Sequence, residues 1–164
     1  MKHLLSVIIA LFLCSCFSAQ AQDRVAVLKF SNLDGKEEMD KYCLMFQDSL
    51  IAHFIAEDPD ELNYQIVPAD SIQYKLDQIG TNPRKPSYQD DLWGVIEALG
   101  CKRAVMGEIL MNGDKMVVNV SVYDVEMRLP LPDHKIRNLF ATPERLPSLF
   151  PRISKKLRPG VLGN

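Results

Sequence analysis

The feature that most constrains the fold is a β-hairpin signal in the second half of the chain. Residues 104–111 are mainly apolar, Asn112 and Gly113 follow, and residues 115–125 alternate valines with polar side chains. Asn-Gly adopts the positive φ angles of a type I′ turn, whose twist matches that of two antiparallel strands. The alternation predicts one buried and one wetter face. The chain therefore contains a sheet that other elements must cover.

Helical and extended segments alternate before this hairpin. Residues 24–30 and 64–67 favour strands, while residues 36–56 follow a helical period. The apolar stripe of that helix comprises Met39, Cys43, Phe46, Leu50 and Phe54, and is widened by Leu44, Ile51 and Ile55. Two further helices are predicted near residues 70–79 and 87–99. We therefore expect an α/β two-layer sandwich, with a mixed β-sheet of about four to five strands and helices packed on it.

The region 129–164 has a weaker pattern. Pro130 and Pro132 exclude a central strand, because proline donates no ladder hydrogen bond. Residues 136–140 favour a short edge strand. The helix that Thr142-Pro143-Glu144 begins contains Pro147 and Pro151, so we expect it to be kinked or in two parts.

Residues 1–21 have the pattern of a signal peptide. A basic start is followed by the apolar run 4–12, and Ala19-Gln-Ala21 supplies the small residues that a signal peptidase requires. The apolar run is shorter than the roughly 20 residues of a membrane-spanning helix. We expect residues 22–164 to form a single exported domain, in the periplasm or secreted, that begins at Gln22.

A second cleavage pattern overlaps the first. Leu13-Cys-Ser-Cys16 resembles the lipobox of bacterial lipoproteins, in which the last cysteine is lipidated. The alternative to a soluble exported protein is thus an outer-membrane lipoprotein tethered through Cys16. We expect contact with a membrane only in that lipidated form.

Two cysteines, Cys43 and Cys101, lie beyond residue 21. In an oxidising compartment they are a candidate disulfide, and closing this loop would contribute about 4 kcal/mol in the chain-entropy treatment. The alternative is two separate buried thiols. Their spacing does not match a zinc site.

Charge is divided unevenly along the chain. Residues 22–133 hold 11 Lys and Arg against 20 Asp and Glu, a net charge of −9, whereas residues 134–164 hold 7 against 1, a net charge of +6. The candidate basic interaction patch in this segment comprises Arg145, Arg152, Lys155, Lys156 and Arg158. It either meets an anionic partner or surface, or is a solvated helix face that complements the acidic body. We expect no nucleic-acid partner, because no aromatic residues are interleaved with these charges.

The sequence carries no recognised catalytic, cofactor or metal motif. The loop after the first strand has one glycine, Gly35, and acidic residues follow it, so it lacks the pattern of a phosphate-binding loop. His53 lies beside the stripe of the long helix, and His134 lies in a proline-rich loop beside Asp133. We expect no enzyme activity and no cofactor. The alternative, a small hydrolase of unknown substrate, predicts an acid-lined cleft near His134.

Several short motifs resemble the TolB amino-terminal-domain-like family in sequence and in order. The segment VAVLKFSNLDG at residues 25–35 is similar to the opening "VAVLPF-N-G" strand of that family. The helix with FQDSL at 46–50 and the strand YQIV at 64–67 follow. ALG at 98–100 with AVMGEI at 104–109, and the hairpin that ends at Asp124, are similar to its closing elements. The resemblance covers about residues 24–126.

This resemblance implies a stand-alone α/β sandwich without the β-propeller of TolB. Such domains are typically exported and non-catalytic, and relatives take part in envelope assembly. The usual Asp-x-x-Thr-Gly after the last strand is replaced by Asp124-Val-Glu-Met-Arg128, which leaves the fifth strand of the family uncertain in this chain. No functional residues carry over. We therefore expect an envelope accessory domain that binds one or more envelope proteins, with the partner and the oligomeric state undetermined.

Overall fold

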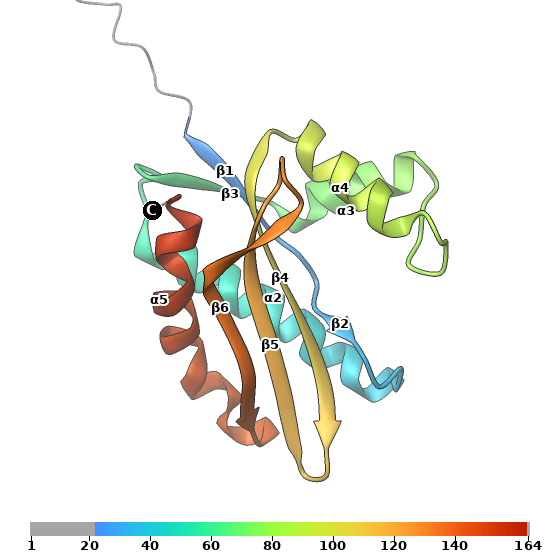
Figure 1. The fold of residues 1–164 in the computed structure, drawn as a ribbon, viewed down its shortest axis with the longest axis vertical. Helices are drawn as coiled ribbons and strands as arrows, with labels where there is room; N and C mark the ends of the chain where they lie inside the picture. Colours follow the sequence, from blue (N-terminus) through green and yellow to red (C-terminus); the bar gives the residue numbers. More distant parts are fainter. Residues whose placement is uncertain (1–21, 164) are drawn as a thin grey trace, which may run out of the picture.

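A six-stranded mixed β-sheet forms the centre of the molecule in the computed structural model, which describes residues 22–163 (Figure 1). The strands are β1 (Asp23–Val27), β2 (Ser31–Asn32), β3 (Tyr64–Val67), β4 (Cys101–Asn112), β5 (Lys115–Asp124) and β6 (Leu129–Ala141). The helices are α2 (Glu37–Glu57), α3 (Ala69–Gln78), α4 (Tyr88–Ala98), the 3-10 helix η1 (Pro143–Leu149) and α5 (Phe150–Val161). The strand order is β3-β1-β4-β5-β6, and β2 pairs with β4.

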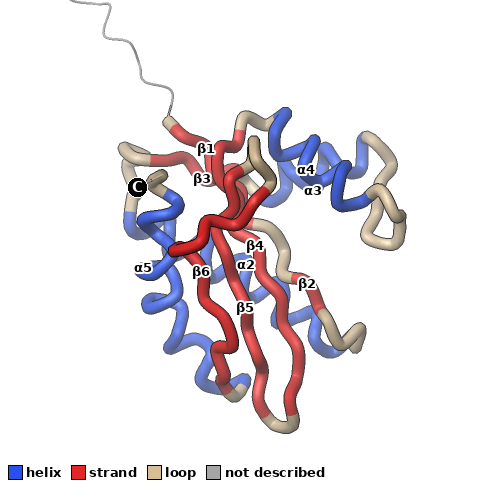
Figure 2. The backbone as a smooth tube through the Cα atoms, in the orientation of Figure 1, coloured by secondary structure: helices blue, strands red, loops and turns tan. Residues whose placement is uncertain are grey.

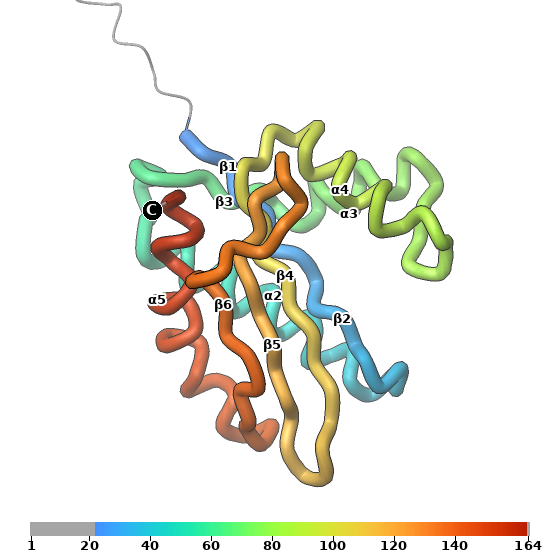
Figure 3. Tube along the Cα trace, in the orientation of Figure 1, coloured from blue at the N-terminus to red at the C-terminus, as the bar shows by residue number. Residues whose placement is uncertain are grey.

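One half of the sheet is parallel and the other antiparallel. β1 pairs in parallel with both β3 and β4. The chain passes from β1 to β3 through α2, and from β3 to β4 through α3 and α4, because parallel strands need such crossover connections. The pairs β4–β5 and β5–β6 are antiparallel. The β4–β5 hairpin is confirmed, with Gly113 at a φ of 65° in its turn. Its tip and the start of β1 lie at opposite ends of the long axis (Figure 3).

The last strand is longer than the sequence predicts. β6 begins at Leu129 instead of residue 136, and it contains Pro130 and Pro132. It lies at the edge of the sheet, where a proline costs no ladder hydrogen bond on the open side. The strand left uncertain by the altered motif after Asp124 is thus present.

Helices pack against the sheet (Figure 2), and their apolar side chains form two separate hydrophobic clusters with it. Residues of α2 and α5 pack with Val25, Val105 and Val122 on one face. Residues of α3 and α4 pack with Ala26 and Ala104 on the other face, at one end of the sheet. Neighbouring residues of one strand enter different clusters because side chains alternate across a strand. The predicted α/β sandwich is confirmed.

The long helix α2 is apolar over a narrower stripe than predicted. Cys43, Phe46, Leu50 and Phe54 are completely buried, as the stripe requires. Leu44 and Ile55, which were expected to widen it, are 46% and 49% exposed. The helix therefore has apolar side chains outside the core as well as inside it.

The C-terminal helix is in two parts, as Pro147 and Pro151 predict. The 3-10 turn η1 precedes α5. α5 returns along β6 and α2 (Figure 1), and its apolar residues Ile153, Leu157 and Val161 complete the first cluster.

Candidate functional site: a groove beside α2

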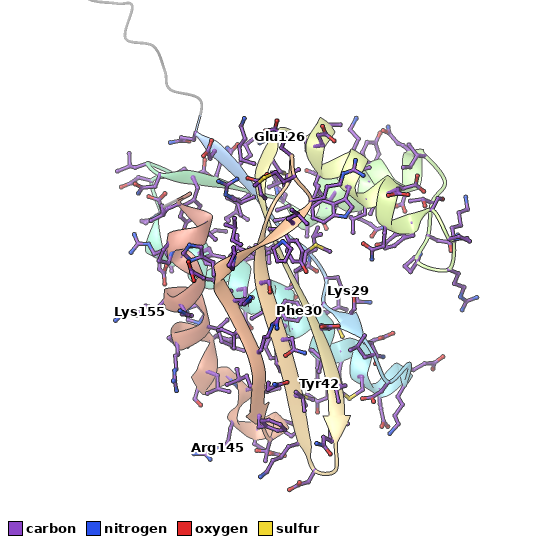
Figure 4. The ribbon with its side chains drawn as sticks, viewed as in Figure 1. Lys29, Phe30, Tyr42, Glu126, Arg145 and Lys155 are labelled. Atoms are coloured by element: carbon purple, nitrogen blue, oxygen red, sulfur yellow. The ribbon has the colours of Figure 1, made fainter. Side chains whose placement is uncertain are left out.

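A groove of about 600 Å³ lies between α2, the segment that follows β1, and the α3–α4 pair. Figure 4 shows Lys29 on this side of the molecule, next to β2. The groove is lined by Leu28, Lys29, Phe30, Ser31, Asn32, Asp40, Leu44, Gln47, Ala69, Asp70, Ile72, Gln73, Leu76, Pro83, Tyr88, Gln89, Leu92 and Met106. It lies beyond the carboxyl ends of the parallel strands β1 and β3, where open α/β sheets commonly hold ligands.

The floor of the groove is apolar because it belongs to the second hydrophobic cluster. Leu28 follows β1, Ile72 and Leu76 come from α3, and Leu92 comes from α4; all four are buried. Leu44 projects from α2 at the rim and is nearly half exposed. The groove thus offers apolar contact area to a second molecule.

A sheet edge forms one wall of this groove. The parallel ladder between β1 and β3 reaches Ala26 and Val67 and then ends. Beyond that point the chain continues through residues 28–32, all of which line the groove, while β2 pairs only with β4. Within residues 22–163, the side of this segment where β3 would continue therefore has no strand partner.

The turn after β2 is held by its own side chains. The Asn32 Oδ1 atom accepts hydrogen bonds from the backbone N–H groups of Asp34 (3.2 Å) and Gly35 (3.1 Å). Asn32 Nδ2 donates to the Lys36 carbonyl (2.8 Å) and to Asp40 (3.0 Å). Because these backbone donors already bind Asn32, the N–H groups of Asp34 and Gly35 are not free to hold an anion. Gly35 adopts a φ of 66° there.

The groove lining contains four titratable side chains. They are Lys29, Asp40, Asp70 and Tyr88, and the lining contains neither histidine nor cysteine. Burial raises the pKa of Tyr88, so its hydroxyl stays protonated at neutral pH. The buried Gln47 amide donates to the Val27 carbonyl (2.9 Å) and fixes α2 on β1. This lining is suited to binding by apolar contact and hydrogen bonds.

The structure does not bring the two candidate disulfide cysteines together. Cys43 and Cys101 are free and buried, and they belong to the clusters on opposite faces of the sheet. Burial raises the pKa of Cys43, and it raises that of Cys101 to about 11. The alternative of two separate buried thiols describes this arrangement.

The candidate basic patch is divided by the fold. Arg145, Arg152, Lys155 and Lys156 are exposed. Arg158 is half-buried, and its Nε atom lies 3.6 Å from Glu57 Oε2, so it also contacts α2. A role of the five residues as an interaction patch stays a prediction.

The other two positions that the sequence singles out are Cys16 and His134. Cys16 lies outside the described residues. His134 packs against α5, where a Cβ atom on Gly160 would lie 2.5 Å from His134 Cβ. His134 does not line the groove beside α2. That groove is therefore not the cleft near His134 that the hydrolase alternative requires.

Residues 22–163 show neither a metal-binding cluster nor a membrane-spanning helix. In this part of the chain, no group of three or more His, Cys, Asp or Glu side chains is placed to hold a metal ion. None of the helices described there combines the length and the apolar character needed to cross a membrane.

Sequence reasoning did not find the groove. Its lining comes from five separate stretches of the chain, and most of these residues have ordinary core or surface roles when taken alone. One signal was available: Leu44 flanks the apolar stripe of the long helix, and an apolar side chain at the margin of such a stripe can mark a binding surface.

Comparisons with protein families and with curated proteins find no match. Solved structures do match in fold. The C-terminal domain of LpoB from Escherichia coli gives a TM-score of 0.51 at 11% identity, over 77% of this chain and 90% of that one. The hypothetical protein CT253 from Chlamydia trachomatis gives a TM-score of 0.54 at 16% identity, over 88% of this chain and 100% of that one.

TolB from Acinetobacter baumannii matches more loosely, with a TM-score of 0.47 and 14% identity, over 87% of this chain and 29% of that one. Identities of this size establish the fold alone. The protein is thus an α/β sandwich with the fold of the LpoB C-terminal domain. Membership of the TolB amino-terminal-domain-like family stays a prediction from its motifs.

Proposed function

We propose that this protein is an exported, non-catalytic accessory domain of the cell envelope that binds another envelope protein. The observation that carries this proposal is the edge of segment 28–32 that faces away from β4, which has no strand partner within residues 22–163 and lies in a groove with an apolar floor. An extended segment of a partner, laid along this edge, would continue the sheet from where β3 ends. Backbone hydrogen bonds would supply affinity, and alternate side chains would enter the floor at Leu28 and Ile72.

The chemistry of the lining supports binding in preference to catalysis. The groove holds apolar surface, amides and isolated charges, and Tyr88 stays protonated. The motifs shared with the TolB amino-terminal-domain-like family also favour an envelope accessory role.

Site-specific cross-linking in producing cells tests this proposal. A photoreactive amino acid replaces Leu44 at the groove rim, and in a matched control it replaces Leu62, which is 74% exposed on the α2–β3 loop. We expect a discrete protein adduct from position 44 and none from position 62. A second chain carries the photoreactive residue at Gln73 in the groove lining and should give an adduct with the same protein. Adding Ile72→Glu to this second chain should abolish its adduct, because the substitution places a charge in the apolar floor.

Two results would contradict the proposal. One is the same adducts from positions 44 and 62, which would indicate non-specific proximity. The other is no adduct from position 44 or position 73 while thermal unfolding shows the variants to be folded.

The tethered form through Cys16 is a separate proposal about the N-terminus. Intact-mass analysis of the mature protein from cell envelopes distinguishes the two forms. A lipid-bearing Cys16 at the N-terminus supports an outer-membrane lipoprotein, whereas an unmodified N-terminus at Gln22 rules it out and supports a soluble exported domain.

A further inference from the structure

A second groove, of about 360 Å³, lies where the end of β6 meets η1 and the start of α5. Its lining residues are Lys115, Leu139, Phe140, Ala141, Thr142, Arg145, Ser148, Leu149 and Arg152. We refer to it as the basic groove. It is distant in the fold from the groove beside α2, and the two share no lining residue.

Three cations from three different elements line the basic groove. Lys115 begins β5, Arg145 belongs to η1, and Arg152 belongs to α5. No Asp or Glu lines it, and the ion pairs found within residues 22–163 involve other side chains. Positive charge is therefore concentrated here without an internal counter-charge in the lining.

The positive surface continues beyond the groove. Lys155 and Lys156 are exposed on α5, and Figure 4 shows Lys155 and Arg145 along the same outer border of the molecule. Phe140, at the groove wall, is 54% exposed. A large aromatic side chain in water next to arginines is a combination that suits an interface between polar headgroups and hydrocarbon.

We propose that the basic groove and the adjoining face of α5 bind the headgroups of anionic phospholipids at a bilayer surface. The cations would neutralise lipid phosphates, and Phe140 would enter the interfacial layer. The acidic remainder of the chain, with a net charge of −9 over residues 22–133, would be repelled by the same surface. The molecule would thus meet the bilayer in one orientation, with α5 toward it.

The spread of the charges favours a bilayer over an acidic peptide. A peptide in the groove would reach Lys115, Arg145 and Arg152, but Lys155 and Lys156 lie outside the lining. A surface of many phosphates engages all five. This contact needs no lipid on Cys16, so the proposal departs from the sequence-based expectation that only a lipidated chain meets a membrane.

Vesicle sedimentation tests the proposal with the full chain carrying Cys16→Ala, which cannot be lipidated, purified in its exported form. The probes are vesicles of equal parts phosphatidylglycerol and phosphatidylcholine, and vesicles of phosphatidylcholine alone. We expect binding to the anionic vesicles that is lost in high salt, and little binding to the neutral ones. Phe140→Ser should weaken binding while its salt dependence persists.

A matched pair of double variants locates the contact. Arg145→Glu with Arg152→Glu should lower partitioning roughly tenfold or more, since each basic residue near an anionic surface is worth about fivefold. Arg84→Glu with Lys85→Glu makes the same charge change in the exposed α3–α4 connection and should leave partitioning nearly unchanged. If the first pair unfolds the protein, Arg145→Gln with Arg152→Gln replaces it, with the same direction of change.

Three results would overturn the proposal. The first is equal loss of binding in both charge-reversed pairs, which would indicate an effect of net charge alone. The second is equal binding to neutral and anionic vesicles. The third is absence of vesicle binding together with binding of soluble poly-glutamate that Arg145→Glu and Arg152→Glu remove, which would assign the groove to acidic proteins.

Discussion

At the scale of single residues, Gly107 in the centre of β4 is set by a close approach. A Cβ atom at this position would lie 2.1 Å from Cε1 of Phe30, so the aromatic ring occupies the space where a side chain would be. Phe30 also stacks on Phe46, with ring centroids 5.0 Å apart. The glycine lets the segment between β1 and β2 close over the sheet.

We predict that Gly107→Ala destabilises the protein by about 1–3 kcal/mol, because the methyl group must displace the buried Phe30 ring. Urea unfolding followed by circular dichroism measures the change. Gly94→Ala is the matched control, since a Cβ atom there meets nothing within 4 Å and alanine favours a helix by about 0.5–1 kcal/mol. Equal effects of the two substitutions would refute this account.

Asp58 is a buried carboxylate that organises the α2–β3 loop. Its oxygens accept the backbone N–H groups of Leu62 (3.1 Å), Asn63 (2.8 Å) and Tyr64 (3.2 Å). Burial acts to raise the pKa of Asp58, but these hydrogen bonds lower it below its usual value. The folded state therefore favours the ionised carboxylate.

Because the pKa of Asp58 is lower in the folded state, this carboxylate contributes stability at pH values above its pKa in the unfolded chain, about 3.9. That contribution is lost as the pH falls through its pKa in the folded state. We expect Asp58→Asn to lower the melting temperature at pH 7 and to reduce its further fall between pH 4 and pH 2. Thermal unfolding across this range measures both effects. Asp60→Asn, at an exposed position in the same loop, is the control and should keep the wild-type dependence of melting temperature on pH. If Asp58→Asn showed that same dependence, Asp58 would not stabilise the folded state as an ionised carboxylate.

At the scale of elements, α5 is held by contacts that no local pattern specifies. Phe150 packs edge-on against Phe46 of α2, with centroids 5.0 Å apart. The Ser154 hydroxyl donates to Glu57 Oε1 at 3.0 Å, and Arg158 approaches the same carboxylate. The aromatic contact and the polar contacts thus hold α5 against α2.

We predict that Phe150→Ala costs about 3–5 kcal/mol, because it removes a side chain that is 3% exposed. Faster amide exchange in α5 should accompany the loss. Hydrogen exchange with mass spectrometry measures both the global stability and which segments exchange faster. Ile55→Ala, which truncates an exposed side chain of α2, should change stability by less than about 0.5 kcal/mol; a comparable cost would show that Phe150 does not anchor α5.

At the scale of the whole molecule, the sheet separates two hydrophobic clusters and one cysteine lies in each. Cys43 is enclosed by α2 and α5, and Cys101 by α3 and α4. A disulfide requires Cα atoms within about 7 Å, and the intervening sheet keeps these residues on opposite sides. The division into two clusters therefore decides the state of the thiols.

We predict that residues 22–163 contain two free thiols that react with Ellman's reagent only after unfolding. Burial excludes the reagent, and the raised pKa values keep both groups protonated near neutral pH. Thiol counts with and without guanidinium test this, with Cys43→Ala and Cys101→Ala identifying each group. An intact mass lower by two hydrogens would show a disulfide and contradict the arrangement.

Local sequence patterns predict most elements of this fold. Three local patterns depend only on residues close together in the chain: the alternating valines of β5, the Asn-Gly turn and the apolar stripe of α2. The structure has a strand, a hairpin and a helix at these positions. The start of β6 was missed because its prolines oppose a strand locally. Only its place at the sheet edge makes them acceptable.

The sequence alone determined the class of fold, the division of charge and the absence of a recognised catalytic motif, since composition and periodicity depend on residues close together in the chain. The tertiary structure decided which surfaces are free. Within residues 22–163 it left one edge of segment 28–32, the edge away from β4, without a strand partner in a groove. It also separated the cysteines and brought Lys115 from β5 next to Arg145 and Arg152. These features depend on contacts between distant segments, which are set by packing rather than by any local pattern.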